Sequence, residues 1–261
     1  MWCTFQGGKE RRRPARAVRR CGAAEFARTR LGFEPDAAQI EVLESTAKRG
    51  MLNCSRQWGK STIAAAKAVH RGWSEPGSLV LAASPSERQS GEFVRKARDF
   101  VRRLGSRPRG DGDNHLSLLL PNGSRILGLP GIDGTVREFS GANLIIVDEA
   151  ARVSDALYKS LRPMLAVRNG DLWLLSTPFG KRGFFYEEWA HGGPGWARFS
   201  VPATECPRIA AEFLEEERAK LGNAWFRQEY LCEFVDSGAS TFDRGLVEGA
   251  VSDEAEPLFM S

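Results

Sequence analysis

The sequence predicts an α/β fold in which helices flank a mainly parallel central sheet. Short apolar runs of strand length alternate with longer amphipathic segments along most of the 261 residues. Parallel strands need crossover connections, and a helix between successive strands supplies them. An Asn-Gly pair between two further apolar runs adds a hairpin, so we expect one antiparallel piece at the edge of the sheet.

The first helix is expected in residues 33–50, FEPDAAQIEVLESTAKRG. Its apolar residues recur at helical spacing: Ile40, Leu43 and Ala47. Asp36, with Gln39 three residues later, forms a plausible N-terminal capping pair, and Gly50 is expected to end the helix.

Two strand-and-helix units follow. The run at 51–54 precedes a helix that begins at Lys60, and the run at 78–84 precedes a helix that continues through Leu104. The second helix carries an apolar stripe of Phe93, Ala97, Phe100, Val101 and Leu104. Asn122-Gly123, inside HLSLLLPNGSRILGLP, marks the turn of the edge hairpin.

Later strands are expected at LIIV and LWLLS, residues 144–147 and 172–176. They are followed by a helical patch FFYEEWA, a strand WARFSVPA, a charged helix RIAAEFLEEERAKLG and the closing segment WFRQEYLCEFV. We therefore expect one large domain over residues 31–236, preceded by a basic and flexible arm over 1–30 and followed by a linker or tail over 237–261.

Charge is concentrated at the N-terminal end. The first thirty residues hold nine Lys or Arg against two Asp or Glu, a local +7, which leaves the rest near −3 because the whole chain carries +4. Such an arm is either a solvated tail or a contact for nucleic acid or an acidic partner. No apolar stretch follows it, so it does not resemble a secretion signal.

Other bulk features narrow the class of protein. The longest apolar runs fall far short of the roughly 20 residues that span a bilayer, which predicts a soluble protein with no membrane partner. The five cysteines form no C-x-x-C pair and the three histidines are scattered. We therefore expect reduced thiols and no structural zinc.

The segment NCSRQWGKST matches most of the phosphate-binding loop pattern G-x-x-x-x-G-K-[ST]. Gly59 would let the backbone approach phosphate, Lys60 would reach the β and γ phosphates, and Ser61 would ligate Mg²⁺. An apolar strand precedes the loop and a helix follows it, as a phosphate cradle requires. Cys54 occupies the place of the first glycine, and the alternative interpretation is a simple strand-to-helix turn.

Two further strands end in residues that suit this chemistry. LIIV runs into Asp148 and Glu149, which we expect at the carboxyl edge of the sheet beside the loop. Asp148 would hold Mg²⁺ and Glu149 would orient and deprotonate the attacking water, unless both only cap the next helix. The strand LWLLS ends in Ser176 and Thr177, whose hydroxyls could contact the γ-phosphate or the water.

These three segments, each after an expected strand, resemble the ATPase domain of the large subunit of tailed-phage terminases. The resemblance covers about Phe33 to Asp236 and rests on SRQWGKS, LIIVDEA and STP, while FRQEYLCEFVD looks like the family's close to the ATPase core. It implies that the domain over 31–236 is an ATPase with a P-loop NTPase fold. The family commonly lacks the first glycine and keeps an arginine in the loop, which suggests Arg56 as a phosphate contact.

The resemblance also implies roles for other residues. A glutamine that reads adenine maps best to Gln39, where helix capping is the alternative. An arginine offered to the neighbouring subunit's γ-phosphate maps to Arg137, with Arg152 and Arg162 nearby. Thr177 would couple hydrolysis to movement. The residues expected to bind ATP are Gln39, Ser55, Arg56, Gln57, Trp58, Gly59, Lys60, Ser61 and Thr62. Those expected in catalysis are Glu149, Lys60, Arg56, Arg137 and Thr177.

The helix SERQSGEFVRKARDFVRRLG places Arg95, Arg98 and Arg102 away from its apolar stripe. A solvated basic face is one explanation. A packaging motor must also grip a phosphate backbone by charge, so this helix or the N-terminal arm is a candidate DNA contact.

The resemblance predicts Mg²⁺-dependent ATP hydrolysis that drives double-stranded DNA into a viral procapsid in the cytoplasm of a bacterial host. The partners it implies are double-stranded DNA, a small terminase subunit, a portal protein and further copies of the chain in a ring. Family members continue into a nuclease domain, and because few residues follow Asp236 we expect no such domain and no nuclease activity here. The alternatives are a helicase-like nucleic-acid ATPase and a non-hydrolysing nucleotide-binding assembly subunit.

Overall fold

The computed structural model describes residues 21–110, 115–131 and 139–236. Seven strands form one sheet in the order β3-β4-β2-β5-β6-β1-β7. Their bounds are β1 Arg49–Cys54, β2 Leu79–Ser84, β3 Ser117–Leu119, β4 Arg125–Pro130, β5 Leu144–Asp148, β6 Asp171–Ser176 and β7 Ala197–Val201. All pairings are parallel except that of β3 with β4, which confirms the predicted α/β fold and its antiparallel edge hairpin.

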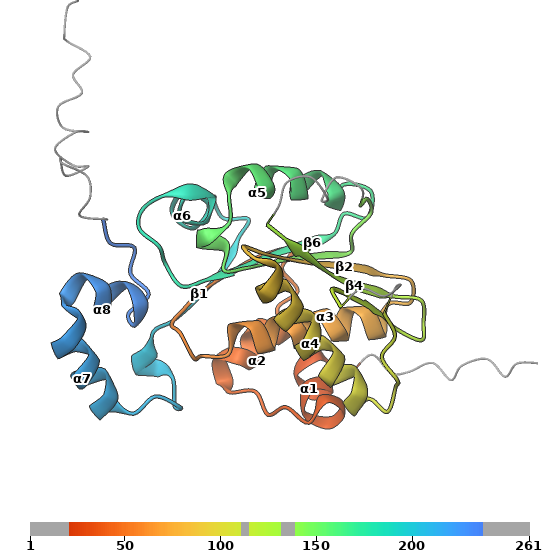
Figure 1. Cartoon of the computed structure of the whole chain (residues 1–261), viewed down its shortest axis with the longest axis horizontal. Coiled ribbons are helices and arrows are strands. Elements are labelled where there is room, and N and C mark those ends of the chain that lie inside the picture. The colour runs from red at the N-terminus through yellow and green to blue at the C-terminus, as the bar shows by residue number, and fades with distance from the viewer. Residues whose placement is uncertain (1–20, 111–114, 132–138, 237–261) are drawn as a thin grey trace, which may run out of the picture.

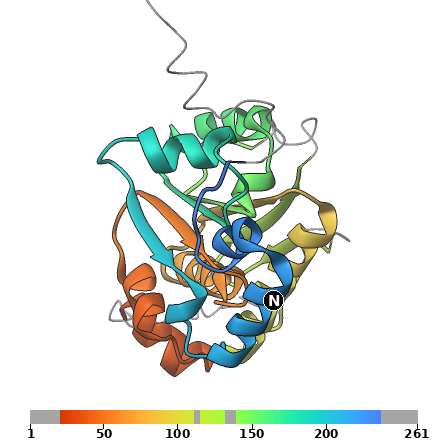
Figure 2. The same cartoon turned by 90° about the vertical axis from the view of Figure 1, so that its left-hand side faces the viewer.

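The helices form a layer on each face of the sheet (Figure 1). One layer holds α1 Ala23–Leu31, α2 Ala37–Glu44, α3 Lys60–Ser74 and α4 Glu87–Arg103. The opposite layer holds α5 Asp155–Leu161, the 3-10 turn Arg162–Leu165 and α6 Gly183–His191. The remaining helices, α7 Ala211–Leu221 and α8 Asn223–Glu229, share a small apolar cluster of their own at one end of the molecule (Figure 2).

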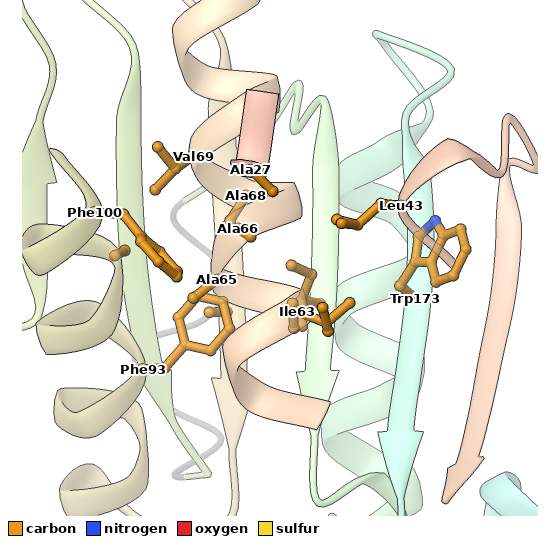
Figure 3. Close-up of a cluster of buried hydrophobic side chains, with 14 of the residues drawn as sticks. Ala27, Leu43, Ile63, Ala65, Ala66, Ala68, Val69, Phe93, Phe100 and Trp173 are labelled. Atoms are coloured by element: carbon orange, nitrogen blue, oxygen red, sulfur yellow. The ribbon is translucent and has the colours of Figure 1, made fainter. Parts of the chain in front are cut away.

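The central strands are buried on both faces, because successive side chains of a strand point to opposite sides. In β5, Leu144 and Ile146 pack toward α3, while Ile145 and Val147 pack toward α5 and α6. Alanines on α3 let it lie close to the sheet and to α4, where Phe93 and Phe100 fill the space (Figure 3). The apolar stripe predicted for α4 is confirmed, with Phe93, Ala97, Phe100 and Val101 buried and Leu104 partly buried.

Two boundaries differ from those expected. Residues 23–31 form α1 and contribute five buried apolar residues, so this part of the expected 1–30 arm packs onto the domain; residues 1–20 lie outside the described residues. The first expected helix ends at Glu44, with Ser45 as its C-cap, and Gly50 lies in β1 instead.

Gly50 is required in β1 for steric reasons. A Cβ built there would lie 2.5 Å from the Trp173 ring. Trp173 is 1% exposed and Lys67 Nζ lies 4.1 Å from the centroid of its ring, so the ring has no free space to move into. The glycine therefore marks close packing within the sheet and not the end of a helix.

We predict that Gly50→Ala lowers the free energy of unfolding by about 1–3 kcal/mol, the usual cost of overpacking a core. Urea denaturation measures it. Gly195→Ala is the matched control, because a Cβ there meets nothing within 4 Å, and surface changes usually stay within about 0.5 kcal/mol. Equal stability of the two variants would contradict the steric argument. In the described ranges of the chain, no helix is long and apolar enough to cross a bilayer.

Candidate nucleotide-binding site

The loop between β1 and α3 has the backbone of a phosphate cradle. Gln57 and Gly59 adopt left-handed φ angles of 65° and 100°, and Gly59 is the N-cap of α3. A Cβ at Gly59 would lie 3.3 Å from Gln39 Nε2, so both the backbone angle and the space favour glycine. The free N–H groups at the start of α3 give this loop a positive end.

Cys54, which replaces the first glycine of the loop pattern, is the last residue of β1 and not part of the turn. It is fully buried in the apolar core and is paired in register with Val201 of β7. Burial raises the pKa of its thiol far above the usual value. A small apolar side chain therefore suits this position, and the flexibility needed for phosphate lies at Gln57 and Gly59.

Lys60 lies folded over the loop and is only 7% exposed. Its Nζ donates to the carbonyls of Cys54 and Ser55 at 2.8 and 2.9 Å, and to Thr177 Oγ1 at 3.2 Å. Thr177 in turn donates to the Cys54 carbonyl at 3.3 Å. The end of β6 is thus joined to the loop through one ammonium group.

Ser61 and Asp148 come together although 87 residues separate them in sequence. Ser61 Oγ donates to Asp148 Oδ2 at 2.8 Å, and Asp148 is 7% exposed. The other carboxylate oxygen accepts from the Glu149 backbone N–H at 3.0 Å. Mg²⁺ prefers oxygen ligands and is commonly held by one or two carboxylates together with substrate phosphates, so this pair fits the ion.

Glu149 follows in a left-handed conformation, with φ of 51°. Burial raises the pKa of its carboxyl, the Lys60 cation opposes the shift, and the Asp148 carboxylate adds to it. Arg152 Nη1 donates to Glu149 Oε2 at 3.2 Å. A carboxylate with a raised pKa beside a phosphate loop is suited to act as a general base.

The strand order explains why these groups meet. β6 lies between β1 and β5, so the residues that follow it reach both neighbours. Thr177 contacts the loop as described, and Ser176 Oγ accepts from the Ala151 backbone N–H, just past Glu149, at 3.2 Å. The two hydroxyl residues thus connect the loop with the turn that carries the base.

Arg56 reaches toward α8. Its Nε donates to Glu229 Oε2 at 2.6 Å, and Arg152 Nη2 lies 3.6 Å from the other oxygen of the same carboxylate. Glu229 has 3% of its side chain exposed, whereas Arg56 has 61%. Gln228 also accepts from the Gly180 backbone N–H at 3.0 Å. The end of α8 is therefore fixed to the loop and to the segment after β6.

Gln39 has the capping role that the sequence allowed. Its Oε1 accepts from the Asp36 backbone N–H at 3.0 Å, and Asp36 Oδ1 accepts from the Gln39 N–H at 2.9 Å. Its Nε2 also donates to the Trp58 carbonyl at 2.9 Å, where Arg208 Nη2 donates at 2.6 Å. Gln39 thus supports the loop from below, and its contact with adenine stays a prediction.

A cavity of about 570 Å³ opens over the loop, within the size range of small-ligand sites. Of the residues predicted to bind or process ATP, it is lined by Arg56, Gln57, Gly59, Lys60, Ser61, Thr62 and Glu149. Ser55 and Trp58 are fully buried beneath it. The sequence interpretation missed Gln89 and Lys96 of α4 as lining residues and gave Arg152 no role in binding; only their place in the three-dimensional fold reveals them.

The other predicted contacts lie elsewhere. Arg95 and Arg102 are exposed on α4 and form ion pairs with Glu92 and Asp99. Arg98 donates to the carbonyls of His115 and Ser117 near β3. Arg137 lies outside the described residues.

Comparison with known proteins decides the family. The sequence profile described as "Terminase large subunit, T4likevirus-type, N-terminal" matches residues 51–248, which is well over half of the chain. The chain belongs to the terminase large-subunit family.

Relatives and solved structures agree. The terminase large subunit of Thermus virus P23-45 is 27% identical over 81% of this chain and 51% of that protein, and that of Escherichia phage T5 is 29% identical over 80% and 49%. The large terminase ATPase domain of Thermus phage P74-26 superposes with a TM-score of 0.72 at 26% identity, over 80% of this chain and 97% of that one. This chain thus spans about half the length of its curated terminase relatives.

The HK97 large terminase shows the same fold more distantly. Its TM-score is 0.69 at 15% identity, over 82% of this chain and 55% of that chain. The large terminase of another thermophilic bacteriophage, in complex with ADP, has a TM-score of 0.63 at 12% identity, over 76% and 53%. These likenesses support the P-loop fold of the terminase domain.

Proposed function

We propose that this terminase domain is a Mg²⁺-dependent ATPase that drives translocation of double-stranded DNA into a viral procapsid. The observation that carries the proposal is the contact of Ser61 with Asp148 at 2.8 Å, beside Lys60 and Glu149. It brings metal ligands, phosphate donor and base to one edge of the sheet. The related Thermus phage domain is described as an ATPase domain, and a more distant terminase is described in complex with ADP.

The residues divide the work of hydrolysis as follows. The N–H groups around Gly59 and the Lys60 ammonium hold the phosphates, which replace the Cys54 and Ser55 carbonyls as acceptors for Lys60. Ser61 and Asp148 hold Mg²⁺, which supplies charge neutralisation at the phosphate oxygens when bound. Glu149 accepts a proton from a water molecule as the water oxygen attacks the γ-phosphorus and ADP leaves.

Thr177 is placed to report this reaction. It accepts from Lys60, so a change of acceptor at the ammonium changes the hydrogen bonding of the segment after β6. Gly180 of that segment binds Gln228 of α8. We infer that Thr177 couples the phosphate state to α7 and α8, and that Arg56 contacts phosphate by leaving Glu229.

Two measurements test the ATPase proposal. Phosphate release from ATP by the purified chain is expected in Mg²⁺ and is expected to stop in excess EDTA. Release that persists in EDTA would contradict the metal assignment, and a native chain without turnover would favour the non-hydrolysing assembly role.

The remaining assignments follow from the family and stay proposals. They are Arg137 as the arginine given to a neighbouring copy, Gln39 as an adenine contact, a ring of copies, a small terminase subunit and a portal protein as partners, and the host cytoplasm as the location. Double-stranded DNA is proposed to contact α4 through Arg95, Arg98 and Arg102.

Charge reversal tests the DNA contact. Replacing Arg95, Arg98 and Arg102 by glutamate is expected to reduce DNA-stimulated ATPase activity and to flatten its dependence on salt, because phosphate contacts release counterions. The rate without DNA measures any general damage. Unchanged stimulation with an unchanged salt slope would exclude this helix.

A further inference from the structure

α4 contributes two side chains to the nucleotide cavity, Gln89 and Lys96. They lie seven residues apart, about two turns, and so share one side of the helix. That side lies between the buried stripe and the exposed crest that carries Arg95 and Arg102. α4 therefore meets the nucleotide site along one flank.

The sheet order fixes which end of the cavity this is. Counted across the sheet from the phosphate loop, the strands run β1, β6, β5 and β2. Glu149 follows β5, and α4 follows β2, the next strand beyond it. Gln39 and β7 lie on the opposite side of β1. Since the base must stand beside the γ-phosphate, the α4 side chains lie at the γ-phosphate end, away from the end proposed for adenine.

The charges around the cavity match a polyphosphate at that end. Four cations line it, Arg56, Lys60, Lys96 and Arg152, against the single carboxylate of Glu149. Arg56 and Arg152 are bound to carboxylates. Among the described residues, no carboxylate lies within ion-pair distance of Lys96, although its neighbour Arg95 has two such partners.

We propose that Lys96 binds the γ-phosphate of ATP from α4, and this rests on the ATPase function proposed above. Lysine carries a compact charge on a flexible stem and binds phosphate as a point charge. Lys96 is partly exposed, so its ammonium can turn toward a ligand at small cost. The contact exists with ATP and is lost with ADP, which makes α4 responsive to the bound nucleotide.

The same helix carries the proposed DNA contacts on its outer side. A γ-phosphate bound by Lys96 would therefore act on a single rigid element that faces both ligands. This arrangement requires no change in the core, because the packed stripe of α4 lies on a third side.

Nucleotide binding by the purified chain with Mg²⁺ tests the proposal, using ATPγS and ADP as probes in calorimetry. Lys96→Met is expected to weaken ATPγS binding about 10-fold or more, the size expected for a charge-assisted hydrogen bond, with ADP binding changed less than about 2-fold. Lys96→Arg is expected to recover most of the ATPγS affinity. Lys159→Met is the matched control, since this exposed lysine lies outside the cavity.

The outcomes separate the two proposals. Equal affinities of Lys96→Met and the native chain for ATPγS, or an equal loss for ATPγS and ADP, would overturn the role of Lys96 and leave the ATPase function standing. A native chain that binds neither nucleotide would overturn both. Thermal unfolding of each variant confirms that the comparison is made between folded proteins.

Discussion

Replacing Glu149 by glutamine is expected to lower ATP turnover by about 10²–10⁴-fold, the usual contribution of a general base. Glutamine keeps the size of the side chain and can still accept from Arg152, but it cannot take a proton from water. Nucleotide binding should stay close to that of the native chain because Lys60, Ser61 and Asp148 are unchanged. Single-turnover hydrolysis and ATPγS titration measure the two quantities.

The pH profile gives this prediction a second readout. Burial raises the pKa of Glu149 above its ordinary value, so native turnover should fall on acidification through a pKa higher than that of an exposed glutamate. The glutamine variant should lack this acid limb. A variant that kept the limb, or that turned over ATP at the native rate, would show that another group is the base.

The same shift predicts that the loss of turnover does not come from unfolding. A carboxyl whose pKa is raised by folding binds its proton more tightly in the folded state, so stability falls as the pH rises from the unfolded pKa through the folded one. At neutral pH the native carboxylate therefore disfavours the fold. Glu149→Gln is expected to unfold at the same or a higher urea concentration than the native chain.

The second large effect is expected for Lys60→Met. The loss of a buried charge-assisted donor to phosphate should weaken ATP binding by about 10–100-fold. The variant also leaves the carbonyls of Cys54 and Ser55 and the Thr177 hydroxyl without their shared donor, so a modest loss of stability should accompany it.

Lys48→Met is the control for that variant. Lys48 is exposed, donates to the Asn169 carbonyl and lies outside the cavity, so its removal tests the effect of lost charge alone. ATPγS titration with Mg²⁺ compares the two. Equal affinities of Lys60→Met and Lys48→Met would contradict the assignment of the loop.

The sequence was most informative where chemistry is local. Gly59, Lys60 and Ser61 are adjacent along the chain and their types follow from phosphate binding, and Asp148 with Glu149 ends an apolar run. The mainly parallel sheet follows from the alternation of strands and helices. The 2.8 Å contact of Ser61 with Asp148 agrees with what these motifs predicted.

It was least informative where tertiary packing decides. Gly50 read as the end of a helix, although its role is to accommodate Trp173 in the neighbouring strand. Cys54 read as a defect of the loop, although it belongs to β1 and the core. Residues 23–31 were obscured by the basic composition around them, although their apolar face packs in the core.

Lys96 shows the same limit within the site. Its neighbours Arg95 and Arg98 made it part of a basic helix, and no spacing rule separates one cation of such a helix from the next. The strand order places α4 beside β5, and only that order brings Lys96 to the cavity. Arg152 and Glu229 meet for a similar reason, since α8 returns to the loop from far along the chain.

The most direct test of the account is the rate of ATP hydrolysis by the native chain in Mg²⁺, measured with and without double-stranded DNA. The account predicts turnover that rises when DNA is added and that the DNA-dependent part declines as salt increases. A native chain that binds ATP but releases no phosphate under either condition would contradict the motor function.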